Sequence, residues 1–508
     1  MRESKPERVL GRDAEWSTLA GFVAHPDPHL RLAVVSGRRR VGKSYLLRAL
    51  VEAVGGLYVS AVAEEGPVAA RQRFAAEIAR YAGIGPGMIR DDAGWEALLE
   101  TALDLVVRRA GPGGVLVIDE VPYWLEHTPQ LPGLLQLLYD RSRAGGGTAG
   151  GRVVLCGSAV SVMTTLLSGT KALRGRAAVD LRLAPFDLAT TARHWGVADP
   201  QAALYLHATL GGSPGYRDLA PIPAPRTLVD FGTWVACTLL DPGQALFSRS
   251  ETEYLLREDP KFTGSALHYA ILNAVAAGAG SPAKIGSLVG RDRAALTRPL
   301  DALTSAGFLR YERDPLWERR SVITLADPIV RFHNLIAVRQ HDLVETGRSV
   351  QAWQAAQPTF TSQILGPHFE HCARDWVRRT GDPIRGGSVG GGAGTVAATV
   401  VNDRAGRARH EIDVVALDRA AGGGRTVIRV IGEAKATITR RGLSELHRLE
   451  RLKALLHDEG HDTTDARLVV FSMAGFHPEL LALAGQRPDV HLVDLPTLLG
   501  QPSPEHRL

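Results

Sequence analysis

Short apolar runs alternate with helix-like stretches between Arg31 and about Asp180. The runs are rich in Val, Ile and Leu, as strands of a buried sheet are, and they lie at residues 32–36, 57–60, 115–119 and 153–156. Because strands and helical stretches alternate along the chain, the pattern predicts an α/β domain in which helices cover a parallel sheet.

A different pattern begins near Ser265. Three helix-like periods precede two short strands, which are separated by a turn at Asp314–Pro315. Because proline is tolerated only in the first turn of a helix, Pro299 predicts that the third helix begins close to Thr297. The predicted elements are helices at 270–276, 284–289 and about 297–307, and strands at 308–313 and 321–325. Three helices followed by a two-stranded ribbon predict a winged helix.

The C-terminal part of the chain has a third pattern, which follows a glutamine-rich stretch at 351–357. It combines an amphipathic helix with two strands that are joined by glycines, and its polar strand residues recur with a period of two. The predicted elements are a helix at 368–376, a glycine-rich strip at 386–394, strands at 411–417 and 427–435, and a turn at 422–424. The two strands are expected to form a hairpin.

Composition indicates a large folded protein. Of the 508 residues, 45% are hydrophobic and 22% are charged, which allows several cores and roughly three domains. No apolar run approaches the roughly 20 residues of a membrane helix, and the first residues lack an apolar signal core, so we expect a cytoplasmic protein with no membrane partner. The three cysteines form no CxxC pair, which indicates neither a disulfide framework nor a zinc knuckle.

A glycine-rich loop at residues 37–44 lies between the first predicted strand and a helix-like stretch, and it fits G-x-x-x-x-G-K-[ST]. Gly37 and Gly42 let the backbone approach phosphate oxygens, and the N-terminus of the helix offers N–H groups. Lys43 adds a full charge, and Ser44 would ligate Mg²⁺. The predicted nucleotide-binding residues are Gly37, Arg38, Arg39, Arg40, Val41, Gly42, Lys43, Ser44 and Tyr45.

A second nucleotide signature is the apolar strand 115–119, which ends in Asp119 and Glu120. Asp119 can hold the Mg²⁺ shell, and Glu120 can orient or deprotonate the water that attacks the γ-phosphate. The alternative is a glycine-rich turn and a buried strand that ends in Asp-Glu by chance. Two motifs in the correct order and context favour a site for ATP with Mg²⁺.

The chain resembles the archaeal-type ATPase branch of the AAA+ superfamily. The segments that carry the resemblance are 11–15, 37–44, 117–120, 157–158, 173–176, 183–186, 211–216 and 327–332. The resemblance implies that Ser158 is a polar sensor of the γ-phosphate or the attacking water. It also implies that Arg174 or Arg176 reaches that phosphate, from the same chain or from a neighbouring subunit, unless both are solvated surface charges. The turn at 211–216 would end a helical lid.

The predicted winged helix carries a modest excess of positive charge. Residues 281–320 contain eight Lys or Arg and five Asp or Glu. Arg291, Arg293 and Arg298 lie at the third helix, and Arg319 and Arg320 lie at the wing, where DNA phosphates would be contacted. The pattern indicates DNA binding; the alternative is that the winged helix mediates contacts between domains.

Glu433 and Lys435 project to the same side of one predicted strand, and Asp413 lies on the neighbouring strand. Two carboxylates and one ammonium can therefore converge. Hard oxygen ligands suit Mg²⁺ or Mn²⁺, and Lys435 can position a water. The alternatives are a solvated sheet face with an ion pair and a nuclease fold without catalysis.

This arrangement resembles the PD-(D/E)XK nuclease superfamily. The resemblance implies that Glu370, on the preceding helix, is an acid that supports the metal. Ile412 stands before Asp413 where the motif has proline, which weakens the match in sequence more than in chemistry. The predicted catalytic residues of the whole chain are Glu120, Ser158, Arg176, Asp413, Glu433 and Lys435, and the predicted metal ligands are Ser44, Asp119, Glu370, Asp413 and Glu433.

Together these patterns predict an α/β chain of four domains. They are a P-loop AAA+ ATPase core with a parallel sheet (1–195), a helical lid (196–262), a winged helix (263–345) and an α/β restriction-endonuclease-like domain (346–508). We expect ATP binding and hydrolysis to gate metal-dependent cleavage of DNA. The alternative is an ATP-dependent regulatory or defence switch that cuts nothing. The sequence leaves open whether the chain forms a homo-oligomer.

Overall fold

The computed structural model describes residues 4–90, 92, 94–145, 151–169, 171–259, 262, 266–317, 320–380, 394–403, 406–418 and 425–502. The chain divides into two compact units. The first comprises Met1–Phe186, Ser213–Gly215 and Tyr254–Gly264, and the second comprises Asp187–Gly212, Tyr216–Glu253 and Ser265–Leu508. The division into four domains stays a prediction. Within the described residues, no helix is both long and apolar enough to span a membrane.

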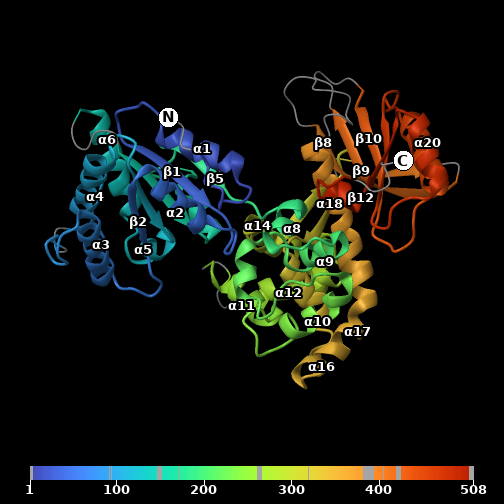
Figure 1. Cartoon of the computed structure of the whole chain (residues 1–508), viewed down its shortest axis with the longest axis horizontal. Helices are drawn as coiled ribbons and strands as arrows, with labels where there is room; N and C mark the ends of the chain where they lie inside the picture. The colour runs from blue at the N-terminus through green and yellow to red at the C-terminus, as the bar shows by residue number, and fades with distance from the viewer. Residues whose placement is uncertain are drawn as a thin grey trace. The chain divides into compact units, whose positions relative to one another are not determined.

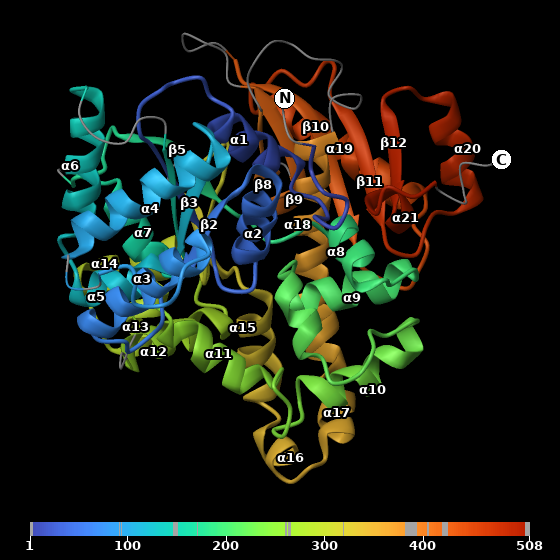
Figure 2. The ribbon, with the colours of Figure 1, turned by 60° about the vertical axis from the view of Figure 1, so that its left-hand side comes forward.

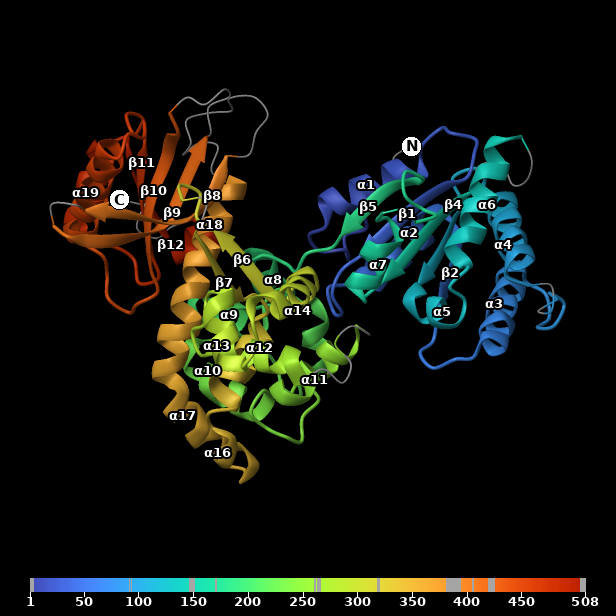
Figure 3. The same cartoon turned by 180° about the vertical axis from the view of Figure 1, so that it is seen from behind.

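The first unit contains a five-stranded parallel sheet in the order β2-β3-β4-β1-β5 (Figures 1 and 3). Its strands are β1 (Arg31–Ser36), β2 (Gly56–Ser60), β3 (Val115–Asp119), β4 (Arg152–Gly157) and β5 (Ala177–Arg182). The four strands predicted from the sequence are present, three of them slightly longer than expected. The edge strand β5 was not predicted.

Helices cover both faces of this sheet, because alternate strand residues belong to two separate cores. One core joins the sheet to α1 (Asp13–Val23) and α2 (Lys43–Val54). The other joins it to α3 (Pro67–Ala82), α4 (Gly94–Ala110), α5 (Val121–His127), α6 (Leu131–Arg143) and α7 (Val160–Leu166). The expected helix-covered α/β sheet is confirmed.

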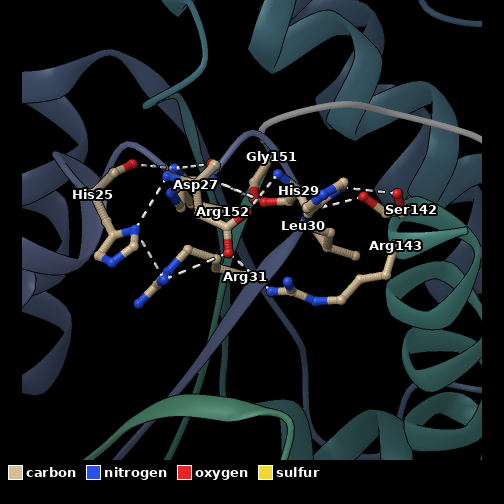
Figure 4. Close-up of polar contacts among 9 residues, drawn as sticks. All are labelled: His25, Asp27, His29, Leu30, Arg31, Ser142, Arg143, Gly151 and Arg152. Carbon is tan, nitrogen blue, oxygen red and sulfur yellow. Dashed lines mark hydrogen bonds and ion pairs between the residues drawn. The ribbon is translucent and has the colours of Figure 1, made fainter. Parts of the chain in front are cut away.

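Buried Arg152, at the start of β4, organises the edge of the sheet at which the strands begin (Figure 4). Its guanidinium donates hydrogen bonds to the carbonyl oxygens of His25 (2.7 Å), Asp27 (3.0 Å) and His29 (3.2 Å). A backbone hydrogen bond from His29, helped by Arg143, lowers the pKa of Asp27 to about 2. This network fixes the loop that leads from α1 into β1.

The second unit begins with helices and a hairpin. Its elements up to residue 380 are α8 (Leu188–Trp195), α9 (Pro200–Leu210), α10 (Leu228–Thr238), the first part of α11 (Ser248–Arg257), α12 (Ala266–Ala276), α13 (Pro282–Val289), α14 (Arg293–Ser305), β6 (Leu309–Arg313), β7 (Ser321–Leu325), α15 (Pro328–Phe332), α16 (His341–Glu345), α17 (Ser349–Thr359) and α18 (Gly366–Thr380). The order α12-α13-α14-β6-β7 is the one expected for a winged helix, and β6 pairs antiparallel with β7. The winged-helix assignment itself stays a prediction.

Helix α14 corrects one prediction, because it begins at Arg293 and contains Pro299 in its interior. The side chain of Asp292 caps the helix by accepting a hydrogen bond from the N–H of Ala295 (2.7 Å), which fixes an earlier start than Thr297. The first turn of α14 is exposed, so water can bond the carbonyl oxygen that finds no N–H at the proline.

The C-terminal sheet is mixed and has the order β12-β11-β10-β9-β8 (Figure 2). Its elements are β8 (Thr395–Asp403), β9 (Ala408–Asp418), β10 (Val427–Lys435), α19 (Leu443–Asp458), β11 (Arg467–Ser472), α20 (Pro478–Gln486), β12 (Val490–Asp494) and α21 (Leu495–Leu498). The predicted hairpin is the antiparallel pair β9–β10, and α18 packs against both strands. The turn at 422–424 and the glycine-rich strip, except for Gly394, lie outside the described residues.

Candidate functional site

The phosphate loop connects β1 to the N-terminus of α2, as the sequence predicted. Gly42 has a φ of 91° and precedes the helix directly. Gly37 has a φ of 151°, and a Cβ atom there would lie 2.8 Å from the carbonyl oxygen of Leu183. Both positions therefore require glycine. The Lys43 Nζ atom donates to the carbonyl oxygens of Gly37 (2.8 Å) and Arg38 (3.1 Å), so the charge lies inside the loop.

The two predicted Mg²⁺ ligands of this site touch each other. The Ser44 hydroxyl donates to Asp119 Oδ2 at 2.6 Å, and the Tyr58 hydroxyl donates to the same oxygen. Burial alone would raise the pKa of Asp119, but hydrogen bonds from Cys156, Ser44 and Tyr58 outweigh burial and lower it. An ionised carboxylate beside a hydroxyl is a donor set that fits Mg²⁺.

Glu120 and Ser158 also meet at this edge of the sheet. The Ser158 N–H lies 3.0 Å from the Glu120 carboxylate, and the Ser158 hydroxyl lies 2.8 and 2.9 Å from its two oxygens. Glu120 has a left-handed backbone (φ 51°), a conformation that is uncommon outside glycine and marks functional sites. Burial raises the pKa of Glu120, against the opposing charge of Lys43. Such a carboxylate can accept a proton from water.

Glu258, which the sequence did not predict as a site residue, also lies at the nucleotide site. Glu258 lies against the loop and the predicted sensor: its Oε1 is 3.2 Å from Arg39, and it accepts a hydrogen bond from the Ser158 hydroxyl. Asp259, the next residue, binds the N–H and hydroxyl of Ser161 at 3.2 and 2.7 Å. No sequence motif marks these two acids, which follow an ordinary polar helix.

Arg176 does not lie with these residues. β5 runs parallel to β1 and pairs Ala177 with Leu32, so Arg176 lies at the edge where the strands begin, whereas the phosphate loop follows the end of β1. The Arg176 guanidinium forms two hydrogen bonds of 3.0 Å to Asp140. Arg174 donates to the carbonyl oxygen of Gly169. This placement corrects one alternative, in which Arg176 reaches the phosphate from within its own chain. Contact of Arg174 or Arg176 with the phosphate of a neighbouring subunit stays a prediction.

The second unit brings the predicted nuclease residues together. Lys435 Nζ lies 2.6 Å from Glu433 Oε1 and 3.5 Å from Asp413 Oδ2, and the Ala434 N–H donates to Asp413 Oδ2 at 2.9 Å. Glu433 is buried, and Arg448 lies 3.2 Å from its second oxygen. The ammonium of Lys435 thus holds a position between two carboxylates.

Glu370 is the third acid of this cluster. Burial and the negative charge of Asp413 raise its pKa to about 7. Burial and Glu433 likewise raise the pKa of Asp413, and the two carboxylates raise the pKa of Lys435 even though burial lowers it. A bound divalent cation would relieve the repulsion among Glu370, Asp413 and Glu433. These oxygen donors therefore fit Mg²⁺ or Mn²⁺.

Two features orient these acids. Asp413 lies in a β-bulge: Ala397 of β8 pairs with Val415 of β9, but Thr399 pairs with Ile412, so two residues of β9 face one of β8. Buried Arg374 of α18 donates to the Asp413 carbonyl oxygen at 2.9 Å and lies 3.8 Å from Glu370. Neither feature is visible in the sequence motif.

The tip of the β6–β7 hairpin is held by the C-terminal sheet. Asp314 accepts a hydrogen bond from the Thr399 hydroxyl at 2.6 Å, and Trp317 Nε1 donates to the Val400 carbonyl oxygen at 2.9 Å. Arg320 lies 3.9 Å from Asp314, and Arg319 lies outside the described residues. Three other predicted DNA contacts are exposed, namely Arg291, Arg293 and Arg298.

Among the described residues, one group combines three side chains of metal-ligating type: His207, His368 and Cys372, all buried. His207 Nδ1 lies 2.9 Å from His368 Nε2, and Arg331 lies 3.3 Å from His368 Nδ1. Because arginine only donates, His368 Nδ1 is the acceptor and Nε2 carries the proton that His207 accepts. A protonated Nε2 has no lone pair for a metal, so the group is a hydrogen-bond network.

Comparison with known proteins agrees with the geometry of the first unit. A family model described as an AAA domain matches residues 29–164. This range contains the phosphate loop, Asp119, Glu120 and Ser158, so the first unit contains a P-loop ATPase domain of the AAA type. No curated protein matches the sequence significantly.

Several solved structures are similar to the chain. A Walker-type ATPase of Pyrococcus abyssi has a TM-score of 0.50 and 20% sequence identity and covers 66% of this chain and 98% of its own, which shows a shared fold. The ORC2 protein of Aeropyrum pernix, in ADPNP and ADP complexes, has a TM-score of 0.40 and 14% identity and covers 70% of this chain and 98% of its own. Cdc6p of Pyrobaculum aerophilum has a TM-score of 0.31 and 14% identity, with 70% and 97% covered.

Proposed function

We propose that the first unit binds ATP with Mg²⁺ and hydrolyses it. The observation that carries this proposal is the convergence of Lys43, Asp119, Glu120 and Ser158 at one edge of the sheet. Lys43 and the loop N–H groups hold the phosphates, and Glu120 takes the proton of the attacking water while Ser158 keeps its carboxylate in place. Ser44 and Asp119 would hold the Mg²⁺ that neutralises phosphate charge.

A phosphate-release assay tests this proposal. Lys43→Ala should abolish ATP turnover and weaken binding of a fluorescent ATP analogue, since it removes the ammonium that lies against the loop carbonyl oxygens. Lys171→Ala, at an exposed lysine of the same unit, is the matched control and should retain both activities. Turnover by Lys43→Ala at the wild-type rate would exclude the loop as the catalytic site.

We further propose that the C-terminal sheet carries a metal-dependent nuclease that acts on DNA. Support comes from Asp413, Glu433 and Glu370 around the Lys435 ammonium. Asp413 and Glu433 would hold a divalent cation, which supplies Lewis-acid activation of water and charge neutralisation. Lys435 would position the attacking water against the scissile phosphate, and Glu370 would support the metal ligands.

Nicking of supercoiled plasmid in Mn²⁺ or Mg²⁺ tests the nuclease. Asp413→Asn and Lys435→Ala should each abolish nicking, while Glu411→Gln, at an exposed acid on the same strand, should not. Nicking that survives Asp413→Asn would show that another site, or a contaminant, cuts the DNA. The same assay with and without ATP tests whether nucleotide gates cleavage, as the presence of both sites in one chain suggests.

A second candidate function is an ATP-dependent switch that cuts nothing. The bonds of Asp314 and Trp317 to β8 favour it, because a hairpin tip held by protein is not available to DNA. In that case the β6–β7 hairpin serves protein contacts, and DNA contact is limited to the exposed arginines of α14. A chain that turns over ATP but nicks no DNA in Mn²⁺ would select this candidate.

A further inference from the structure

The residues that end and follow α11 are held against the phosphate loop by independent contacts. The guanidinium of Arg39 lies 3.2 Å from Glu258 and 4.5 Å from the ring centre of Tyr254, and Arg40 lies 5.6 Å from the same ring. Asp259 binds Ser161 on α7. The segment therefore touches both the loop and the residues that follow β4, which are the two sides of the predicted γ-phosphate position.

The Ser158 hydroxyl faces more acceptors than it can satisfy. It lies within hydrogen-bond distance of both Glu120 and Glu258, yet a serine hydroxyl has a single proton to donate. The Glu258 side chain is only 8% exposed, so its charge is weakly screened by water. The buried carboxylates of Glu120 and Glu258 repel each other while they share the Ser158 hydroxyl. A ligand that competes for the donors of Glu258 can therefore displace it.

The partners of Glu258 are groups that a phosphate would also take. A carboxylate that accepts from a guanidinium and a hydroxyl uses the same donors as a phosphoryl oxygen, and arginine binds either anion in the same way. Arg39 belongs to the phosphate loop, and Ser158 is the predicted γ-phosphate sensor. A third phosphate at this position and the Glu258 carboxylate cannot both occupy these donors.

We propose that Glu258 competes with the γ-phosphate of ATP for Arg39 and Ser158, and so makes the site discriminate ATP from ADP. In the free and ADP-bound chain, Glu258 occupies these donors, so that Arg39 and Ser158 are not available to a third phosphate. ATP displaces the Glu258 carboxylate from both donors, while Asp259 keeps its bonds to Ser161. The inference rests on the proposed ATP site and adds its regulation.

Binding of ATP, a non-hydrolysable ATP analogue and ADP to the full-length chain tests the inference, by calorimetry in Mg²⁺. Glu258→Gln keeps the shape of the side chain and removes its charge, and loss of one charged hydrogen bond corresponds to about tenfold in a binding constant. We expect the Kd for ATP and the analogue to fall by about tenfold and the Kd for ADP to change by less than about twofold. Glu253→Gln, at an acid paired with Arg249 on the same helix, is the control and should change neither.

The outcomes separate this inference from the proposed function. If wild type binds no nucleotide, the proposed ATP site fails and the inference fails with it. If wild type binds ATP but Glu258→Gln shifts ATP and ADP equally, or shifts neither, the inference alone is overturned. Retained ADP binding by Glu258→Gln shows that the variant is folded, and Glu258→Ala should give the same selective gain for ATP.

Discussion

Glu370→Gln should stabilise the protein at alkaline pH and leave it nearly unchanged at acid pH. Burial and Asp413 raise the pKa of Glu370 from 4.5 to about 7 in the folded chain. The folded state therefore binds more protons than the unfolded state between these two values. The free energy of unfolding then falls as pH rises through this window, and above pH 7 the full destabilisation is present.

The size of the effect follows from the pKa values. At about 1.4 kcal/mol per pKa unit, the difference between 4.5 and about 7 sets an upper limit of about 3.5 kcal/mol. The Glu370 side chain is 32% exposed, so water screens part of the repulsion, and about 1–2 kcal/mol is a realistic expectation. For a domain of this size, that free energy corresponds to a gain in Tm of roughly 2–8 °C.

Thermal unfolding of wild type and Glu370→Gln in EDTA, at pH 5 and pH 8, measures the effect. Glu411→Gln is the matched control, since this acid lies exposed on β9 and should show no pH-dependent gain. An equal change in Tm at both pH values would refute the reasoning, because it would mean that Glu370 is ionised in the folded chain at pH 5. Added Mn²⁺ should stabilise wild type at pH 8 more than it stabilises the variant.

Three further predictions concern other parts of the molecule. Gly37→Ala should destabilise the first unit by about 1–3 kcal/mol in urea unfolding, because its Cβ atom would clash with a backbone oxygen at positive φ. Gly66→Ala, with no atom in its way, should cost less, at most about 1 kcal/mol, which is the difference between these residues at a helix N-cap. Arg176→Ala should leave ATP affinity unchanged in a fluorescence titration, because its side chain binds Asp140; weaker binding would contradict this placement. Trp317→Phe should cost about 1 kcal/mol of local stability. It should speed amide hydrogen exchange in β8, and unchanged exchange there would show that the indole bond does not hold the hairpin tip.

The central strands were predictable because they are buried on both faces and read as continuous apolar runs. β3 matches its predicted range, and β4 extends the prediction by one residue at each end. β5 was missed because it is an edge strand: its residues alternate between half-buried and exposed, and it contains Asp180 and Arg182. Hydrophobicity alone cannot distinguish such a segment from a loop.

Helix α14 shows why a local rule can fail. Pro299 alone predicts a start near Thr297, but the cap at Asp292 and the solvent-exposed first turn outweigh the lost hydrogen bond.

In the nucleotide site, residues of short motifs could be predicted from the sequence, but a contact between residues far apart in the chain could not. Lys43, Asp119 and Glu120 could be found because each belongs to a short motif next to a strand, whereas Glu258 meets Arg39 across 219 positions of sequence.

Because Asp413 lies in a β-bulge, the face of the sheet to which its carboxylate points depends on the number of residues in the bulge. In a regular strand, neighbouring side chains point to opposite faces, so deleting one residue of the bulge would turn Asp413 away from Lys435 without changing any residue type. A second irregularity between Ile428 and Val430 lies within the spacing that separates Asp413 from Glu433. Searches for related sites by fixed spacing should therefore allow one residue more or fewer between the two acids, and insertions in this hairpin can silence the cluster while every motif residue is retained.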